Sequence, residues 1–273
     1  MEQRLILRGF ASGALSGLLA FVFGRILAEP VIQRAIDYEN GRDAAESALR
    51  RAAGLAAAAH DPELFSRGLQ RNAGFSIAMV LFGVAMGGLL AVAYALIARS
   101  GRPRVRGRGV APAIAAAGFA GFFLLPFLKY PADPPGLGRA ETIHTRGLLY
   151  LAMVAISVLS VLAAVLAARR LKAELGSRHA AVVALVALAG WMAIVMAVLP
   201  SLEPPQPLRD PSGAVVYPGF PDDVLFQFRL CAIGAQLILW STLGLAFGAL
   251  AERLMTGAAA PSARPERTVD ALS

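Results

Sequence analysis

The chain has 273 residues, of which 57% are apolar and 16% are charged. Soluble domains average about 45–50% apolar and about 25% charged residues, so the composition excludes an ordinary soluble fold. The formal net charge is +8, and Cys231 is the only cysteine, which excludes an intrachain disulfide and a cysteine-based zinc site. Because most of the basic residues flank long apolar blocks, we assign the positive charge to membrane topology and expect no nucleic-acid partner.

Six apolar blocks are long enough to cross a hydrocarbon layer of about 30 Å as helices. We expect an all-α, polytopic protein of the lipid bilayer, because a lipid-exposed backbone must form its own hydrogen bonds. The six predicted spans lie near residues 9–28, 75–98, 110–128, 147–168, 180–199 and 224–251. We interpret the first as an uncleaved span, since its apolar stretch is longer than that of a typical signal peptide and no A-x-A cleavage site is evident.

The connections predict how the spans are oriented. Both tails and the segments between spans two and three and between spans four and five hold 14 basic and 5 acidic residues. The other three connections hold 10 basic and 13 acidic residues. Positively charged loops stay in the cytoplasm. We therefore expect a bacterial inner-membrane protein with both termini in the cytoplasm and its acidic loops outside.

The outer connections differ in character. The first, residues 29–73, contains an Ala-, Arg- and Glu-rich stretch that we expect to be helical over 33–59. Seven prolines between residues 199 and 223 exclude regular helix and a central strand there. Prolines also follow spans one and three, which favours three helical hairpins of one plan; alternatively, prolines simply collect at helix ends. The tail, residues 256–273, is expected to be a disordered cytoplasmic segment.

Glycines spaced four residues apart predict close packing of helices in lipid. Such pairs and triplets occur in three spans: Gly9, Gly13 and Gly17; Gly83 and Gly87; Gly244 and Gly248. These faces either pack inside the bundle or contact a partner, which includes a second copy of the chain. We favour packing inside the bundle and leave a homo-oligomer open.

Polar residues at the outer ends of the spans are the candidates for function. Arg25 and Glu29 lie one helical turn apart at the end of span one, as a local ion pair or as the entry to a polar pathway. Glu141 and His144 lie three residues apart at the start of span four and match half of a transition-metal site. Alternatively, Thr142 caps this helix and Glu141 favours its positive N-terminal end.

A third polar cluster opens span six. Asp222 or Asp223 is the expected N-cap of this helix. Arg229 follows about one turn inside, and we expect it to pair with one of the two acids. Gln236 lies deeper in the same span and needs a hydrogen-bond partner on another helix.

The sequence resembles the CbtA family of bacteria over residues 5–255. Three groups of motifs carry the resemblance: Glu29-Pro30 with Asp37-Tyr38-Glu39; Leu128-Lys129-Tyr130-Pro131-Ala132-Asp133-Pro134-Pro135; and Phe220-Pro221-Asp222-Asp223 with Phe228-Arg229 and Gln236-Leu237-Ile238-Leu239-Trp240. The family consists of predicted cobalt transporter subunits. The positions that match the family, without an assigned role, are Glu29, Glu39, Lys129, Tyr130, Asp133, Arg146, Asp222 and Arg229.

The resemblance implies a membrane subunit for cobalt uptake, with cobalt(II) as the transported ion and no permanently bound cofactor. It also implies a small, single-span, His-rich partner of the CbtB kind. The residues alone do not distinguish cobalt from zinc or nickel. We expect transient metal ligands at Glu29, Asp133, Glu141, His144, Asp222 and Asp223. The expected supporting polar side chains are Arg25, Glu39, Lys129, Tyr130, Arg146, Arg229 and Gln236.

Two alternatives to transport remain open from the sequence. The first is a non-transporting scaffold or assembly protein that recruits partners through its glycine faces. The second is a membrane enzyme at the outer leaflet with His144 as its base. The chain holds none of the common motifs for a hydrolase nucleophile, a zinc protease or a nucleotide. We therefore expect that it is not an enzyme.

Overall fold

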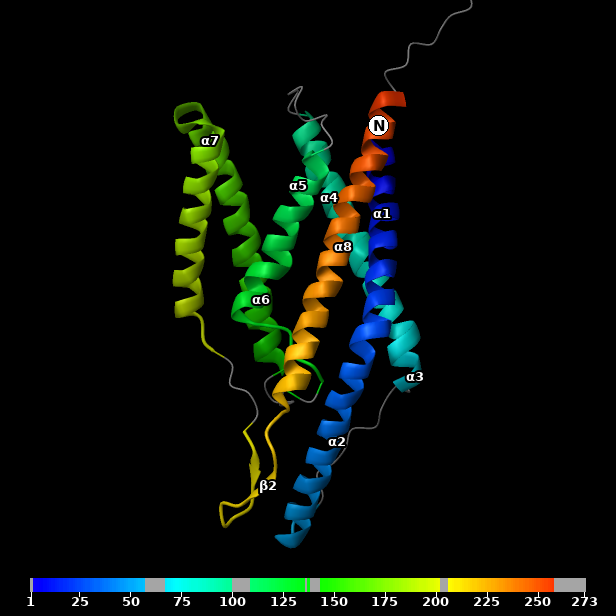
Figure 1. Cartoon of the computed structure of the whole chain (residues 1–273), viewed down its shortest axis with the longest axis vertical. Coiled ribbons are helices and arrows are strands. Elements are labelled where there is room, and N and C mark those ends of the chain that lie inside the picture. Colours follow the sequence, from blue (N-terminus) through cyan, green and yellow to red (C-terminus); the bar gives the residue numbers. More distant parts are fainter. Residues whose placement is uncertain are drawn as a thin grey trace, which may run out of the picture.

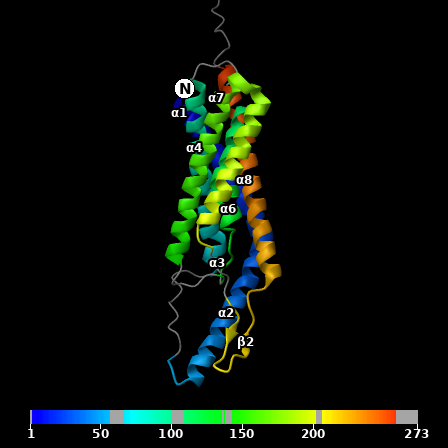
Figure 2. The same ribbon diagram turned by 90° about the vertical axis from the view of Figure 1, so that its left-hand side faces the viewer.

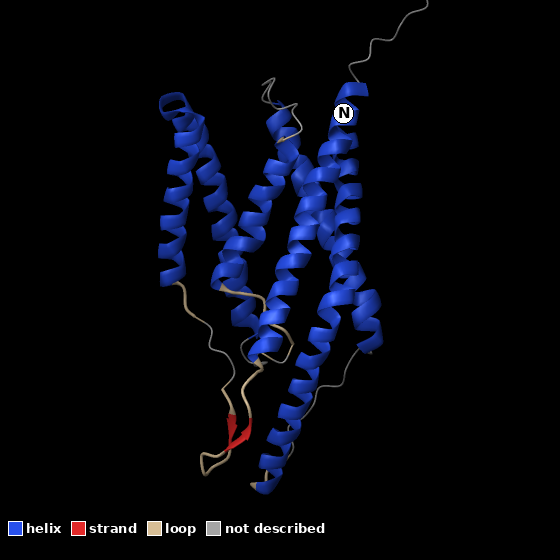
Figure 3. Cartoon of the chain, in the orientation of Figure 1, coloured by secondary structure: helices blue, strands red, loops and turns tan. Residues whose placement is uncertain are grey.

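Long helices make up most of the structure, which is a computed structural model describing residues 2–56, 67–99, 109–135, 137, 143–201 and 206–257 (Figure 3). Five of the described helices are long and apolar enough to cross a membrane: Gln3–Ala52, Asn72–Arg99, Val110–Lys129, His144–Val198 and Asp222–Leu254. The prediction of an all-α, multi-pass membrane protein is confirmed.

The first helix continues well beyond its apolar part. Helix α1 (Glu2–Phe23) leads through a π-helical turn, η1 (Gly24–Ala28), directly into α2 (Glu29–Ala52). Pro30 sits in the first turn of α2, where the wider π-helical turn accommodates a residue without an N–H group. The chain therefore stays helical past residue 28, where the first predicted span ends, and the helix expected over residues 33–59 is present as far as Ala52. At 1.5 Å per residue the 50-residue helix is about 75 Å long, so α2 projects far past the other spans (Figures 1 and 2).

Helices α1 and α4 pack through their glycines. The short α3 (Arg67–Leu69) and the π-helical turn η2 (Gln70–Gly74) precede α4 (Phe75–Arg99). A Cβ atom on Gly13 would collide with the carbonyl of Gly83, and one on Gly83 would collide with the carbonyl of Gly13. The glycine faces of these two helices therefore serve packing inside the chain, as we favoured. Gly244 likewise lies against Ala115 and Pro112.

The third membrane helix also contains a π-helical turn before a proline, as the first does before Pro30. Helix α5 (Val110–Gly118) passes through the π-helical segment η4 (Phe119–Leu124) into α6 (Leu125–Lys129), in which Pro126 lies in the first turn. In both places a π-helical turn stands immediately before a proline.

Helix α7 (Ile143–Val198) folds back on itself. Gly176 has φ 74° and ψ 167°, which is not helical, and the ribbon reverses there (Figure 1). Residues 143–175, the first limb, contain the fourth predicted span, and residues 177–198, the second limb, contain most of the fifth. The first limb packs against η4 and α6, whereas α8 (Asp222–Gly257) packs against α1 and α5. The third expected hairpin, between the second limb and α8, is therefore not a closely packed pair.

The two ends of the bundle differ in charge and in shape. The N-terminus, the junctions around the 100–108 connection, the bend of α7 and the end of α8 lie at one end, the basic end (Figure 1). At the other, the acidic end, α2 lies beside an antiparallel hairpin of β1 (Leu208–Arg209) and β2 (Val215–Tyr217) (Figure 2). Helix α8 runs to Gly257, so the expected disordered tail lies almost wholly outside the described residues.

A core of apolar side chains joins α1, α4, α5 and α8. Phe247 and Leu243 of α8 are fully buried, and the Tyr94 ring meets the Phe247 ring edge-on with 5.4 Å between the ring centroids. Arg8 of α1 donates a hydrogen bond to the Leu250 carbonyl near the basic end. These four helices form the body on which the polar groups of the acidic end are mounted.

Candidate functional site

One carboxylate links three segments at the acidic end. Asp133, in the segment that follows α6, accepts a hydrogen bond from Arg146 Nη1 at 3.2 Å on Oδ2 and one from Arg229 Nη2 at 3.2 Å on Oδ1. Arg229 Nε also donates to the Ala132 carbonyl at 3.4 Å. The segment is thereby tied to the first limb of α7 and to α8 by charge-assisted bonds.

The partner of Arg229 differs from the sequence prediction. Arg229 pairs with Asp133 rather than with Asp222 or Asp223. Asp223 is six residues from Arg229 and lies about 120° away around the α-helix, whereas Asp222 is seven residues away and lies about 10.5 Å along the axis, so neither has the i, i+4 spacing of a local pair. The helix also begins at Asp222, so Pro221 precedes it and its carbonyl accepts from the Leu225 amide. The two acids thus belong to the first turn and not to the N-cap.

A second polar cluster joins α2 to the opposite face of α8. Arg34 Nη1 lies 3.1 Å from Asp223 Oδ2, and Arg34 Nη2 donates to Gln227 Oε1 at 2.6 Å. Asp223 and Gln227 share one face of α8 because they are one turn apart. Arg229, two residues after Gln227, points about 200° away, so α8 is held on two sides at its outer end.

Arg25 forms a contact that the sequence did not predict. Its Nε donates to Asn72 Oδ1 at 3.1 Å, which connects the π-helical turns η1 and η2. The described hydrogen bond of Arg25 therefore joins it to the start of the second span rather than to Glu29. Glu29 itself is only 7% exposed, at the start of α2.

The Lys-Tyr-Pro motif fastens α6 to the end of α7. Tyr130 donates from its hydroxyl to the Pro200 carbonyl at 2.9 Å, and its ring is buried. Lys129 Nζ lies 3.3 Å from Ser201 Oγ and 5.8 Å from the centre of the Tyr130 ring. Both supporting residues therefore hold the acidic end together rather than standing open to solvent.

An aromatic cluster docks the β-hairpin on α2. The Tyr38 ring lies 4.9 Å from the Phe220 ring and 5.3 Å from the Tyr217 ring, and its hydroxyl donates to the Pro218 carbonyl at 2.9 Å. Neither Tyr217 nor Arg34 was singled out from the sequence; their only signal was the charge and aromatic content of the outer loops.

In the hairpin turn, hydrogen bonds from Ser212 and the Ala214 amide lower the pKa of Asp210. Glu39, a position of the family motif, is half-buried on α2.

Polar groups inside the spans bond mostly within their own helix. Gln236 accepts a hydrogen bond from Trp240 at 3.1 Å, one turn along α8, so the expected partner on another helix is replaced by a local one. Ser12 and Ser16 donate to carbonyls of α1. Ser157 is fully buried, and its hydroxyl has no hydrogen-bond partner among the described residues.

The predicted metal ligands are spread over the acidic end. Among the described residues, no group of three or more His, Cys, Asp and Glu side chains lies close enough to hold a metal ion. Asp133 and Asp223 are paired with arginines, whereas Asp222 and His144 are exposed. Glu141 and Thr142 lie outside the described residues. The described part of the chain thus holds candidate ligands but no assembled cage.

Comparison with protein families decides the relationship of the chain. A family model described as "Probable cobalt transporter subunit (CbtA)" matches residues 2–252. The chain belongs to the CbtA family. This match confirms the resemblance found in the motifs. No curated protein and no solved structure matches the chain.

Membership of the CbtA family makes the chain a multi-pass membrane protein of a probable cobalt transporter. It argues against an enzyme, and the word subunit implies partners without naming one. The motifs that carry the likeness to CbtA now have structural roles, since Tyr130, Asp133, Tyr38 and Arg229 each tie two segments of the acidic end together.

Proposed function

We propose that this chain is the membrane subunit of a cobalt(II) uptake transporter in a bacterial inner membrane. The match of the CbtA family model to residues 2–252 carries the proposal. Acidic groups at the outer surface raise the local concentration of a divalent cation. Energy comes from outside the chain, from a partner, the membrane potential or a proton gradient.

The transporter subunit crosses the membrane six times, with both termini in the cytoplasm. The two limbs of α7 count as two spans, because residues 143–175 and 177–198 form helices of about 50 Å and about 33 Å, each enough for a layer of about 30 Å. The excess of arginine at the basic end supports its cytoplasmic placement.

Four of the six predicted ligands act in two groups. Asp222 and His144 are exposed and make no described ion pair, so they meet the incoming ion first. Asp133 and Asp223 can bind a metal only when Arg229, Arg146 or Arg34 releases them, because a divalent cation and a guanidinium compete for the same oxygens. Glu29 and Glu141 complete the expected set on α2 and before α7.

A histidine-bearing, single-span partner supplies the ligands that this chain lacks. The chain has three histidines and one cysteine, whereas cobalt(II) binds imidazole well. A partner helix that brings several imidazoles to the acidic end would complete a site that the described residues do not form on their own.

Uptake of radioactive cobalt tests the proposal. Cells that carry the chain together with its genomic neighbour should accumulate cobalt faster than cells that carry the neighbour alone. Excess zinc or nickel, added in parallel, reports which metal the system prefers. Equal cobalt accumulation with and without the chain would remove the transport proposal.

A scaffold that only assembles or positions a transporting partner is the second candidate. It is favoured by one observation, the small number of polar groups inside the spans, most of which bond within their own helix. The glycine faces of α1 and α4 do not support it, since they are occupied by each other. The same uptake assay separates the two functions, because a scaffold is dispensable when the partner is overproduced and correctly inserted.

A further inference from the structure

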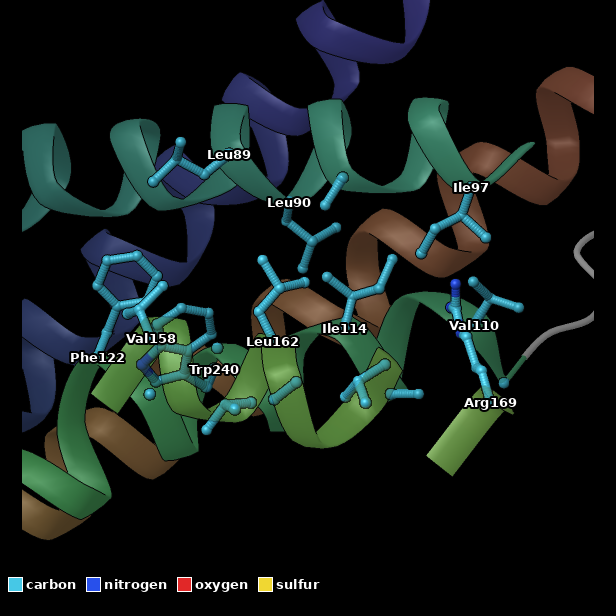
Figure 4. Close-up of a pocket in the computed structure, with 18 of the residues that line it drawn as sticks. Leu89, Leu90, Ile97, Val110, Ile114, Phe122, Val158, Leu162, Arg169 and Trp240 are labelled. Atoms are coloured by element: carbon cyan, nitrogen blue, oxygen red, sulfur yellow. The ribbon is translucent and has the colours of Figure 1, made fainter. Parts of the chain in front are cut away.

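A large groove opens between α4, α5 and the first limb of α7, far from the polar clusters of the acidic end. Its volume is about 1430 Å³, which exceeds the roughly 300–1,000 Å³ of typical small-molecule sites. Leu89 and Leu162 line it and are each about half exposed, so the groove is open on its lipid side. Trp240 and Phe122 lie toward the end of the groove opposite Arg169 (Figure 4).

The walls of this groove exclude a route for a metal ion. They consist almost entirely of aliphatic and aromatic side chains, which offer no oxygen or nitrogen ligands to replace the hydration shell of a cation. Among the described residues that line it, the only charged side chains are Arg169 and Lys172, and both are positive. A dication would therefore be repelled at the one edge that is polar.

The two cations mark the edge of the groove that lies toward the basic end. Arg169 stands beside Val110 and Ile97, where α4 ends and α5 begins (Figure 4). Both Arg169 and Lys172 are exposed, and neither makes a hydrogen bond or ion pair with a described residue. Basic pockets between transmembrane helices on the cytoplasmic side are typical sites for anionic lipid head groups.

We propose that this groove binds an anionic phospholipid, whose acyl chains fill the apolar part and whose phosphate is bound by Arg169 and Lys172. The charge of the edge selects the anionic head group over a zwitterionic one. The length of the groove, from the cations at its edge to Trp240, suits a chain-shaped ligand better than a compact one. The bound lipid would fill the space between the peripheral hairpin of α7 and the body of α1, α4, α5 and α8. The proposal does not depend on transport.

Trp240 offers a local readout of the bound lipid. The chain has only two tryptophans, so Trp191→Phe leaves Trp240 as the single fluorophore, and Trp191 does not line the groove. The purified full-length variant would be placed in phosphatidylcholine vesicles that contain a minor fraction of phosphatidylglycerol. Bromine atoms midway along the acyl chains would be carried either by the phosphatidylglycerol or by an equal fraction of the phosphatidylcholine.

We expect brominated phosphatidylglycerol to quench Trp240 at least about twofold more strongly than brominated phosphatidylcholine, which corresponds to about 0.4 kcal/mol of preference or more. Adding Arg169→Gln and Lys172→Gln should abolish the difference. Arg170→Gln with Arg178→Gln removes the same charge from α7, but neither residue lines the groove, so this control should keep it. Circular dichroism would confirm that each variant is folded.

Three outcomes would overturn the proposal. Equal quenching by the two lipids would mean that the groove holds bulk lipid without selection. Loss of the preference in the Arg170 and Arg178 control would mean that general surface charge recruits the lipid. No quenching by either lipid would mean that the groove is closed or is occupied by protein, such as a partner helix.

Discussion

Arg229 of α8 forms an ion pair with Asp133, 96 positions earlier in the chain, and Arg146 binds the other oxygen of the same carboxylate at 3.2 Å. The Asp133 side chain is 31% exposed, and those of Arg146 and Arg229 are 20% and 34% exposed. Two positive charges thus share one negative charge in a partly dehydrated place. The cluster stabilises the acidic end only while the carboxylate is present.

Asp133→Asn should destabilise the protein by about 1–2 kcal/mol, because it leaves the two guanidinium groups beside each other without a counter-charge. The thermal midpoint in detergent would fall accordingly. Arg229→Gln should also destabilise, but the double variant should cost less than the sum, since each change removes the same bond. Asp37→Asn removes an exposed acid whose described bond is to Gln33 and serves as the control. Additive effects would contradict the pairing.

Gly13→Ala should disrupt the close packing of α1 against α4 and destabilise the protein. The added methyl group would collide with the backbone of Gly83, which cannot move aside as a side chain can, and overpacking of this kind costs about 1–3 kcal/mol or more. Gly190→Ala is the matched control, because nothing lies within 4 Å of the added Cβ atom and alanine favours helix by about 0.5–1 kcal/mol. The two variants should therefore shift the thermal midpoint in opposite directions. Equal shifts would argue against tight packing of α1 on α4.

The sequence predicted what depends on local pattern. Apolar block length predicted the membrane helices, and the i, i+4 glycines predicted close packing inside the bundle, because both are properties of one helix and its immediate surroundings. Gln236 was assigned a partner across helices, but the indole of Trp240 on its own helix satisfies it. A side chain in a span takes the nearest partner, and that choice depends on rotamers that the sequence does not reveal.

The pairs of the acidic end lay beyond prediction for a different reason. Asp133 with Arg229, Arg34 with Asp223 and Arg25 with Asn72 join residues 47 to 189 positions apart, and several arginines and acids compete for each partner. Helix phase and axial spacing decide among them, as the six and seven residues that separate Asp223 and Asp222 from Arg229 show. The continuation of α1 into α2 was also missed, because Pro30 was interpreted as an end whereas a π-helical turn accommodates it.

Cysteine labelling should place the bend of α7 and the β-hairpin on opposite sides of the membrane. In a Cys231→Ser background, Ser212→Cys in the hairpin should react with a membrane-impermeant maleimide. The reagent is added to cells whose outer membrane is permeabilised and whose inner membrane is intact. Ser177→Cys, next to the bend at Gly176, should react only after the inner membrane is opened. Both positions are exposed, so burial does not confound the comparison. Labelling of both cysteines from outside would contradict six spans.

Asp222 and Asp223 form a matched pair for testing ion capture. Both lie in the first turn of α8, but Asp223 is engaged by Arg34 at 3.1 Å, whereas Asp222 is exposed and makes no described ion pair. Asp222→Asn should raise the KM for cobalt uptake about fivefold, as expected for the loss of a ligand that contributes about 1 kcal/mol, and should leave the thermal midpoint unchanged. Asp223→Asn should change KM less and lower the midpoint slightly, since the lost pair is largely exposed.

The reverse result would be equally informative about the ion's path. A raised KM in Asp223→Asn alone would mean that Arg34 releases this carboxylate to the metal, so that the ion enters between α2 and α8. Arg34→Gln would then raise cobalt affinity, because the competing guanidinium is removed from the same oxygens. If neither aspartate changes KM while cobalt uptake still requires the chain, the first contact with the ion lies on the partner, and the acids of this subunit serve only to hold α8 against α2.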